Sequence, residues 1–93
     1  MQNNYLIKVI FMNCYNEQEY QMFIIKIGLK VGYYRRLANM TQEQLSEYSG
    51  MSLKFISQLE GPIAPYVPSL KSLYKISNAL GVPVSKLTDV DDD

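Results

Sequence analysis

Four side chains between residues 52 and 60 have the chemistry needed to recognise nucleic-acid bases. Gln58 can form two hydrogen bonds with adenine, and Lys54 can donate to guanine. Ser57 can bond either base, and Leu53 can contact the methyl group of thymine. Together these four residue types match the donors, acceptors and apolar groups that the edges of base pairs present in a major groove.

The spacing of these residues places them on one side of a helix. At about 100° per residue, the four side chains fall within an arc of roughly 140°. The opposite side carries the apolar residues Phe55, Ile56 and Leu59. One face can therefore belong to a core while the other reads bases, although a face of this composition is also compatible with a merely solvated helix.

A break in the helical pattern precedes this segment. Thr41 and Gln44 have the spacing of a capping box, and they predict a short helix over residues 42–49. Gly50 can take the left-handed conformation that ends a helix, and Ser52 can cap the next helix at once. Two short helices joined by a three-residue corner containing glycine form a helix-turn-helix, which sets the second helix across the first.

Three further helices are expected around this pair. Asn16 can cap a long amphipathic helix that Asn39 ends, and its inner face consists of Tyr20, Ile24, Ile27, Val31, Tyr34 and Ala38. Ser69 can cap a fourth helix that Gly81 ends, with Leu70, Leu73, Ile76 and Leu80 on its inner face. Pro83 suits the first turn of a short last helix. We therefore predict an all-α fold of five helices.

The N-terminal segment has a different composition. Residues 5–12, YLIKVIFM, are rich in β-branched and aromatic residues, so we expect a β-strand there. Such a strand could pair with its copy in a second subunit and so form a dimer. Two alternatives stay open, namely an appendage packed on the helices or an upstream extension with Met12 or Met22 as the start. We assign residues 1–21 to an N-terminal extension that contains this possible dimerisation strand.

The composition of the chain argues against several functional classes. The only cysteine is Cys14 and histidine is absent, so we expect neither an internal disulfide, a metal site, a cofactor nor an enzyme nucleophile with its base. No apolar run is long enough for a membrane span or follows a basic leader, and no small-molecule ligand is evident. We therefore expect a cytoplasmic protein that is not an enzyme.

The charges are distributed unevenly along the chain. The net charge is zero, but residues 24–88 carry eight basic and three acidic side chains, which leaves +5. Four of the nine acidic residues lie in an acidic tail, residues 89–93. This asymmetry is typical of a DNA-binding surface followed by an acidic end, although a solvated surface could also show it.

Two runs of the sequence resemble the Cro/C1-type (XRE) helix-turn-helix family. They are TQEQLSEYSGMSLKFISQLEG and PSLKSLYKISNALGVPVSKL. The resemblance covers about residues 24–88. It implies a five-helix, lambda-repressor-like DNA-binding bundle over residues 22–88, usually a homodimer, that regulates transcription from palindromic double-stranded DNA operators.

The resemblance also implies roles for individual residues. Gln42 matches the family glutamine that grips a phosphate, and Leu53, Lys54 and Gln58 match base-reading positions. Arg35 and Glu60 match an internal ion pair that ties the first helix to the third. To these we add Ser57 as a base-reading residue, and further phosphate contacts that we assign to Ser52, Arg36 and Lys71.

Some positions depart from the family pattern. The loop GPIAPYVPS contains no Lys or Arg, which predicts modest affinity for the DNA backbone. Leu53 is apolar where polar residues are frequent, and Ser46 and Ser49 stand at positions that are usually Ala and apolar, which predicts a lighter core there. These features, with the many tyrosines, leave open a protein-interaction module on the same fold, such as an antirepressor or an antitoxin-like partner.

Overall fold

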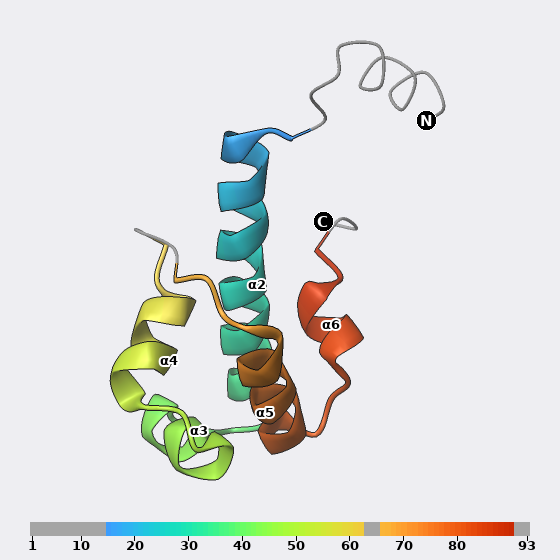
Figure 1. The fold of residues 1–93 in the computed structure, drawn as a ribbon. Coiled ribbons are helices and arrows are strands. Elements are labelled where there is room, and N and C mark those ends of the chain that lie inside the picture. The colour runs from blue at the N-terminus through green and yellow to red at the C-terminus, as the bar shows by residue number, and fades with distance from the viewer. Residues whose placement is uncertain (1–14, 63–65, 91–93) are drawn as a thin grey trace.

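The computed structural model describes residues 15–62 and 66–90, which contain five α-helices (Figure 1). The helices are α2 (Glu17–Leu37), α3 (Gln42–Ser49), α4 (Leu53–Glu60), α5 (Leu70–Leu80) and α6 (Val84–Thr88). The predicted all-α bundle is confirmed, and α3 and α4 occupy the positions predicted for the helix-turn-helix. The expected β-strand over residues 5–12 lies outside the described residues, and the predicted boundary at residue 22 falls within α2.

Side-chain caps begin four of these helices. The oxygens of Asn16, Thr41, Ser52 and Ser69 each accept a hydrogen bond of 3.0 Å from a backbone N–H in the first turn that follows. At α3 the capping box is complete, because the Gln44 side chain also accepts from the backbone N–H of Thr41 at 2.9 Å. The caps satisfy N–H groups that the helix cannot pair itself, so they fix where each helix starts.

Three helices end at residues with a left-handed backbone. Asn39, Gly50 and Gly81 have φ values of 59°, 76° and 73°. Glycine adopts this conformation without the steric cost that a Cβ atom adds, and asparagine tolerates it better than most residues. The predicted ends of α2, α3 and α5 therefore agree with the structure to within two residues.

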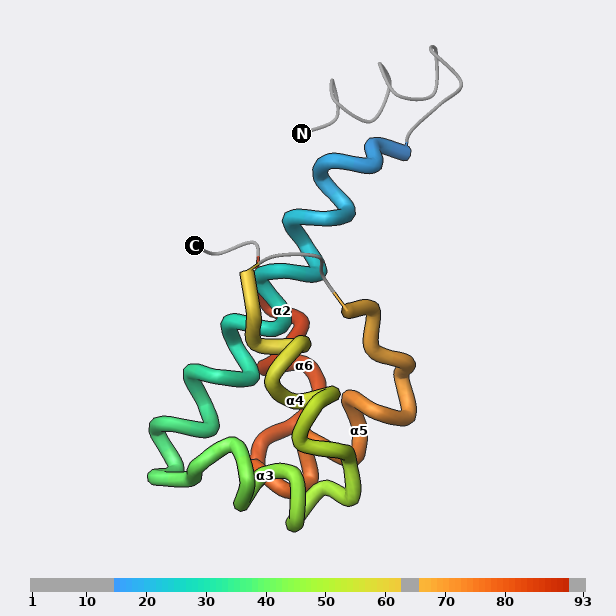
Figure 2. Tube along the Cα trace, turned by 90° about the vertical axis from the view of Figure 1, so that its left-hand side faces the viewer, coloured from blue at the N-terminus to red at the C-terminus, as the bar shows by residue number. Residues whose placement is uncertain are grey.

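The helices are arranged around the lower half of α2. Figure 1 shows α4 on one side of α2, α6 on the other, α5 in front and α3 below. The view turned by 90° shows that the N-terminal part of α2 extends beyond the other helices (Figure 2). α2 packs against α4, α5 and α6, and α3 packs against α4 and α5. Within the two described ranges, no helix is long and apolar enough to cross a membrane.

One hydrophobic core joins all five helices. Its buried members are Ile27, Val31, Leu45, Ile56, Leu59, Leu73, Ile76, Leu80, Leu87 and Val90. The prediction that Leu70 and Ala38 face inward is wrong, because Leu70 is 75% exposed and Ala38 is exposed as the C-terminal cap of α2. Leu70 is the first residue of its helix and lies beyond the core. Conversely, Val90 is buried, although the sequence assigned it to the acidic tail.

Two glycines allow α2 and α4 to approach closely. A Cβ atom on Gly28 would lie 1.8 Å from the backbone oxygen of Leu59, so no larger residue fits without moving a helix. One turn later, a Cβ atom on Gly32 would lie 3.1 Å from a carboxylate oxygen of Glu60. The C-terminal end of α4 therefore lies directly against the α2 backbone.

We predict that Gly28→Ala destabilises the protein by about 2–3 kcal/mol, because the added methyl group forces α2 and α4 apart. Alanine is otherwise the better helix former by roughly 1 kcal/mol, so a loss of stability isolates the steric effect. Urea unfolding followed by circular dichroism measures the change. Gly61→Ala is the matched control, since a Cβ atom there meets its nearest atom at 3.4 Å and should change stability little. An unchanged or raised midpoint for Gly28→Ala would contradict the proposed contact.

Candidate nucleic-acid interface

The outward side of α4 carries the four residues selected from the sequence, and we call this set the reading face: Leu53, Lys54, Ser57 and Gln58. All four are exposed. On the opposite side of the helix, Ile56 and Leu59 are buried and Phe55 packs against the core. The structure therefore brings the predicted base-reading residues together on one free surface.

Hydrogen bonds within the turn fix the angle between α3 and α4. The backbone N–H of Gly50 donates to the Ser46 carbonyl at 3.0 Å. The Ser46 hydroxyl donates to the Met51 carbonyl at 2.6 Å, and the Met51 N–H donates to the Ser49 hydroxyl oxygen at 3.2 Å. Ser46 and Ser49 thus bond backbone groups of the corner, a role that the sequence reasoning missed when it treated them only as small core residues.

An ion pair ties the C-terminal end of α4 to α2. The Nε of Arg35 lies 2.8 Å from Oε2 of Glu60, and Nη2 donates to Oε1 at 3.0 Å. The remaining guanidinium nitrogen donates to the Met40 carbonyl at 2.7 Å. Only 11% and 7% of the two side chains are exposed. The hydrogen bonds to Glu60 raise the pKa of Arg35 above its usual value, so the guanidinium keeps its charge.

Gln42 joins this group from the first turn of α3. Its side-chain nitrogen donates to Oε1 of Glu60 at 3.0 Å. An amide nitrogen carries two hydrogens, so this bond leaves one for another acceptor. The α3 helix itself offers no acceptor to the backbone N–H groups of Gln42 and Glu43, which are in its first turn. The start of α3 can therefore receive an anion, with Gln42 held in place by Glu60.

The other three predicted phosphate contacts come from different elements. Arg36 is exposed at the end of α2, and one guanidinium nitrogen lies 3.2 Å from where a Gly32 Cβ atom would stand. Ser52 caps α4 with its oxygen, so its hydroxyl hydrogen can still donate. Lys71 is exposed in the first turn of α5. No acidic residue occurs in the first turn of α4 or α5, so neither helix start repels a phosphate.

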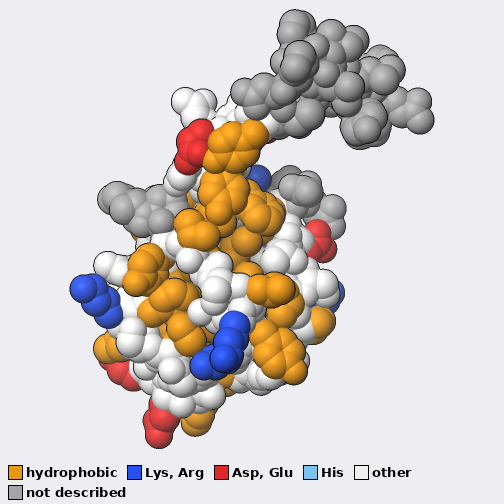
Figure 3. Space-filling model, in the orientation of Figure 1, with side chains coloured by type: hydrophobic (Ala, Val, Ile, Leu, Met, Phe, Trp, Pro, Cys, Tyr) orange, Lys and Arg blue, Asp and Glu red, His pale blue; other side chains and the backbone are white. Residues whose placement is uncertain are grey.

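The basic side chains do not gather into one patch on the face that Figure 3 shows. The Lys and Arg groups visible there are separated by polar and apolar surface. The described part of the loop before α5, residues 61–62 and 66–69, contains no basic residue. These loop positions therefore offer no cation to a phosphate.

An aromatic contact attaches this loop to α4. The rings of Phe55 and Tyr66 have their centroids 5.0 Å apart and are tilted by 52°. Phe55 packs against the core, while Tyr66 is exposed beside the start of α5. In the described residues, no group of three or more His, Cys, Asp or Glu side chains could hold a metal ion.

Comparison with known proteins adds evidence that does not depend on the geometry. Residues 31–87 match the model of a helix-turn-helix family. An uncharacterized HTH-type transcriptional regulator of Methanocaldococcus jannaschii is 39% identical over 64 residues, which cover 69% of this chain and 94% of that protein. No solved structure gave a significant match.

We predict that Arg35→Met destabilises the protein by about 3 kcal/mol, because it leaves the Glu60 carboxylate buried without its partner. The double variant Arg35→Met/Glu60→Leu should lose clearly less than the sum of the two single changes, since no unpaired charge then remains. Chemical unfolding of all three variants measures the coupling. Arg36→Met removes an exposed guanidinium one residue away and should change stability by no more than about 0.5 kcal/mol. Equal losses for Arg35→Met and Arg36→Met would show that the buried pair contributes nothing specific.

Proposed function

Because this chain belongs to the Cro/C1-type helix-turn-helix family of DNA-binding transcriptional regulators, we propose that it recognises a specific double-stranded DNA operator as a homodimer. In this proposal α4 enters the major groove and the reading face contacts base edges. A regulator of this kind acts only by binding DNA, so we assign it no catalytic residue, metal or cofactor. We expect it in the cytoplasm, where it can reach the chromosome.

The proposal rests mainly on α4, which has one buried side and one exposed side. Eight residues form a rod about 12 Å long, and the major groove is about 12 Å wide. The packing of its buried side and the ion pair of Glu60 prevent α4 from rotating about its own axis. The residues left outside, Lys54, Ser57 and Gln58, carry the donors and acceptors that base edges require.

We propose that the phosphate contacts flank this helix. Gln42 would donate its remaining amide hydrogen to one phosphate, supported by the N-terminal dipole of α3. Ser52, at the start of α4, would contribute a hydroxyl group. Arg36, at the end of α2, and Lys71, at the start of α5, would contribute two cations. With so few cations, we expect binding to weaken with salt less steeply than it does for proteins with a large basic patch.

A homodimer would match the symmetry of a palindromic operator. Two recognition helices related by a twofold axis read half-sites one helical turn apart, about 34 Å along the duplex. Doubling the contacts also raises the affinity above what one eight-residue helix can supply.

A protein-interaction module is the second candidate, and the exposed apolar side chains favour it. Tyr48, Val67, Leu70 and Tyr74 are all more than half exposed. Titration of labelled random-sequence duplex at low salt separates the two functions. Binding that weakens as salt is added supports the DNA regulator, whereas no binding at tens of micromolar protein would favour the interaction module.

We predict that Lys54→Ala and Gln58→Ala each cost about 1–3 kcal/mol at the preferred operator and relax the choice of base at one or two positions. Competition between the selected duplex and single-base variants of it measures this discrimination. Lys86→Ala is the control, because it removes the same charge from α6, on the far side of α2 from α4 (Figure 1). If the Lys54→Ala/Gln58→Ala double variant keeps full discrimination, the reading face has been assigned to the wrong residues.

We predict a different result for Gln42→Ala. A phosphate contact carries no sequence information, so all duplexes should be bound more weakly by a similar factor, with the choice of base unchanged. The same competition experiment measures both quantities. Because Gln42 also bonds Glu60, the folded fraction of the variant must first be checked by thermal unfolding. A loss confined to one duplex sequence would contradict the phosphate assignment.

A further inference from the structure

A second apolar surface runs along α2, on the side that faces away from the core. We call it the outer face, and its members are Met22, Leu29, Tyr33 and Leu37, with exposed fractions of 51%, 51%, 53% and 64%. At about 100° per residue they fall within an arc of roughly 80°. The buried residues Ile24, Ile27 and Val31 lie on the opposite side of the helix.

The other helices cover only the inner side of α2. A surface helix of a globular protein usually carries one apolar stripe and a polar opposite side. α2 carries exposed apolar residues on its outward side as well, with Lys26 between Met22 and Leu29, and its N-terminal part extends beyond the other helices (Figure 2). Several exposed apolar residues along one side of a helix are typical of a protein–protein contact.

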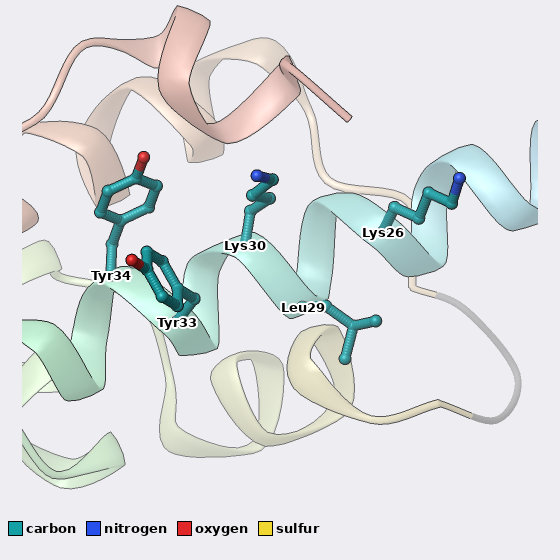
Figure 4. Close-up of a pocket in the computed structure, with 5 residues that line it drawn as sticks. All are labelled: Lys26, Leu29, Lys30, Tyr33 and Tyr34. Carbon is teal, nitrogen blue, oxygen red and sulfur yellow. The ribbon is translucent and has the colours of Figure 1, made fainter. Parts of the chain in front are cut away.

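Two shallow hollows accompany the outer face. The larger has a volume of about 400 Å³ and is lined by Lys26, Leu29, Lys30, Tyr33 and Tyr34 (Figure 4). Figure 4 shows Lys26 and Lys30 extending to one side of α2 and Leu29 extending to the other. The smaller, of about 280 Å³, is lined by Glu19, Met22, Phe23, Lys26 and Val90. Ridges beside hollows are what two packed helices need in order to interdigitate.

We propose that the outer face binds the outer face of a second copy of this chain, with the two α2 helices antiparallel. The charges on the face select this direction. A parallel pair would set Glu19 against Glu19 and Lys26 against Lys26. In an antiparallel pair centred on Ile24, Glu19 lies at the level of Leu29 of the second copy, about one turn from its Lys26. The dipoles of the two helices point in opposite directions in this arrangement, which brings partial charges of unlike sign together.

The same alignment places one apolar residue of the outer face at the hollows. Met22 lies at the level of Lys26 of the second copy, and Lys26 lines both hollows. The alkyl part of Lys26 can cover Met22 while its ammonium group reaches Glu19 or solvent.

The area available is enough for a weak dimer. With roughly 100 Å² of accessible surface on each half-exposed side chain, Met22, Leu29, Tyr33, Phe23 and the neighbouring lysine stems supply about 500 Å² per copy, whereas Leu37 lies beyond the α2 helix of the second copy. The total of about 1,000 Å² is at the low end for protein–protein interfaces and suits a weak association. We therefore expect a dissociation constant in the micromolar range. This inference rests on the proposed homodimer and names the surface that forms it.

Sedimentation velocity of the full chain tests the inference over a range of concentrations. The unmodified chain should dimerise at micromolar concentration, and Leu29→Asp/Tyr33→Asp should weaken the dimer by at least about 30-fold. Leu70→Asp/Tyr74→Asp is the matched control, because it places the same two charges at exposed apolar positions four residues apart on α5. Its dimer should be unchanged. Far-UV circular dichroism should show that both double variants remain folded.

Charge exchange tests the antiparallel direction together with a distance measurement. Glu19→Lys and Lys26→Glu should each weaken self-association, and a mixture of the two variants should form a heterodimer. Nitroxide labels at position 37, on a Cys14→Ser/Leu37→Cys chain, should lie about 35–40 Å apart when the dimer is antiparallel, because 13 residues separate each label from the centre. A separation below about 20 Å would show a parallel pair and overturn the proposed alignment.

The result for the dimer is distinguishable from the result for DNA binding. An unmodified chain that stays monomeric at roughly 100 µM, or a Leu29→Asp/Tyr33→Asp chain that dimerises normally, overturns the α2 interface. Binding to a duplex with a single half-site does not need a dimer. If the monomeric variant binds that duplex as the unmodified chain does, while losing the advantage of a palindrome, both proposals stand.

Discussion

The crossing of α2 and α4 is the contact on which the candidate interface depends. At Gly28 the two backbones approach so closely that only glycine fits. Near the end of α4, the Arg35–Glu60 pair bonds the same two helices through their side chains. A short helix has little stability of its own, because nucleation is costly and eight residues close few hydrogen bonds. α4 is therefore held by its neighbours, and its exposed side is defined by what those neighbours cover.

Glu60 connects the elements to which we assign the base and phosphate contacts. Its carboxylate accepts hydrogen bonds from Arg35 and from Gln42, so α2, the first turn of α3 and the end of α4 meet at one charged group. A buried ion pair of this kind adds less to stability than its short distances suggest, since both charges lose their hydration. Its contribution here is geometric. It keeps α4 and the Gln42 side chain, to which we assign base and phosphate contacts, at a fixed separation.

The helices could be predicted from the sequence because their ends are decided locally. Thr41 with Gln44, Ser52 and Ser69 are caps whose partners lie three residues away, and Gly50 ends α3 through its own backbone conformation. The exposed side of α4 followed from periodicity for the same reason. The sequence alone could not show that Gly28 meets the Leu59 backbone or that Val90 joins the core, since these contacts join segments far apart in the chain. Leu70 was placed wrongly because periodicity ignores where the core ends.

The hydrogen bonds of Ser46 and Ser49 could have been anticipated in part. Serine in a helix commonly bonds backbone groups nearby, and both residues adjoin a corner whose backbone needs partners. The sequence interpretation weighed only their volume. The outer face of α2 was missed for a different reason, because an apolar pattern on two sides of a helix does not say which side the rest of the chain covers.

We propose that the outward side of α4 and the start of α3 together form one DNA-binding surface. The most direct measurement is a titration of isotope-labelled protein with an operator selected from random duplexes, followed by amide resonances in solution. We expect the largest shifts at residues 52–58, at the backbone amides of Gln42 and Glu43, and at the side-chain amide of Gln58. Shifts concentrated on α6 or on the outer face of α2, with the amides of α4 unchanged, would contradict it.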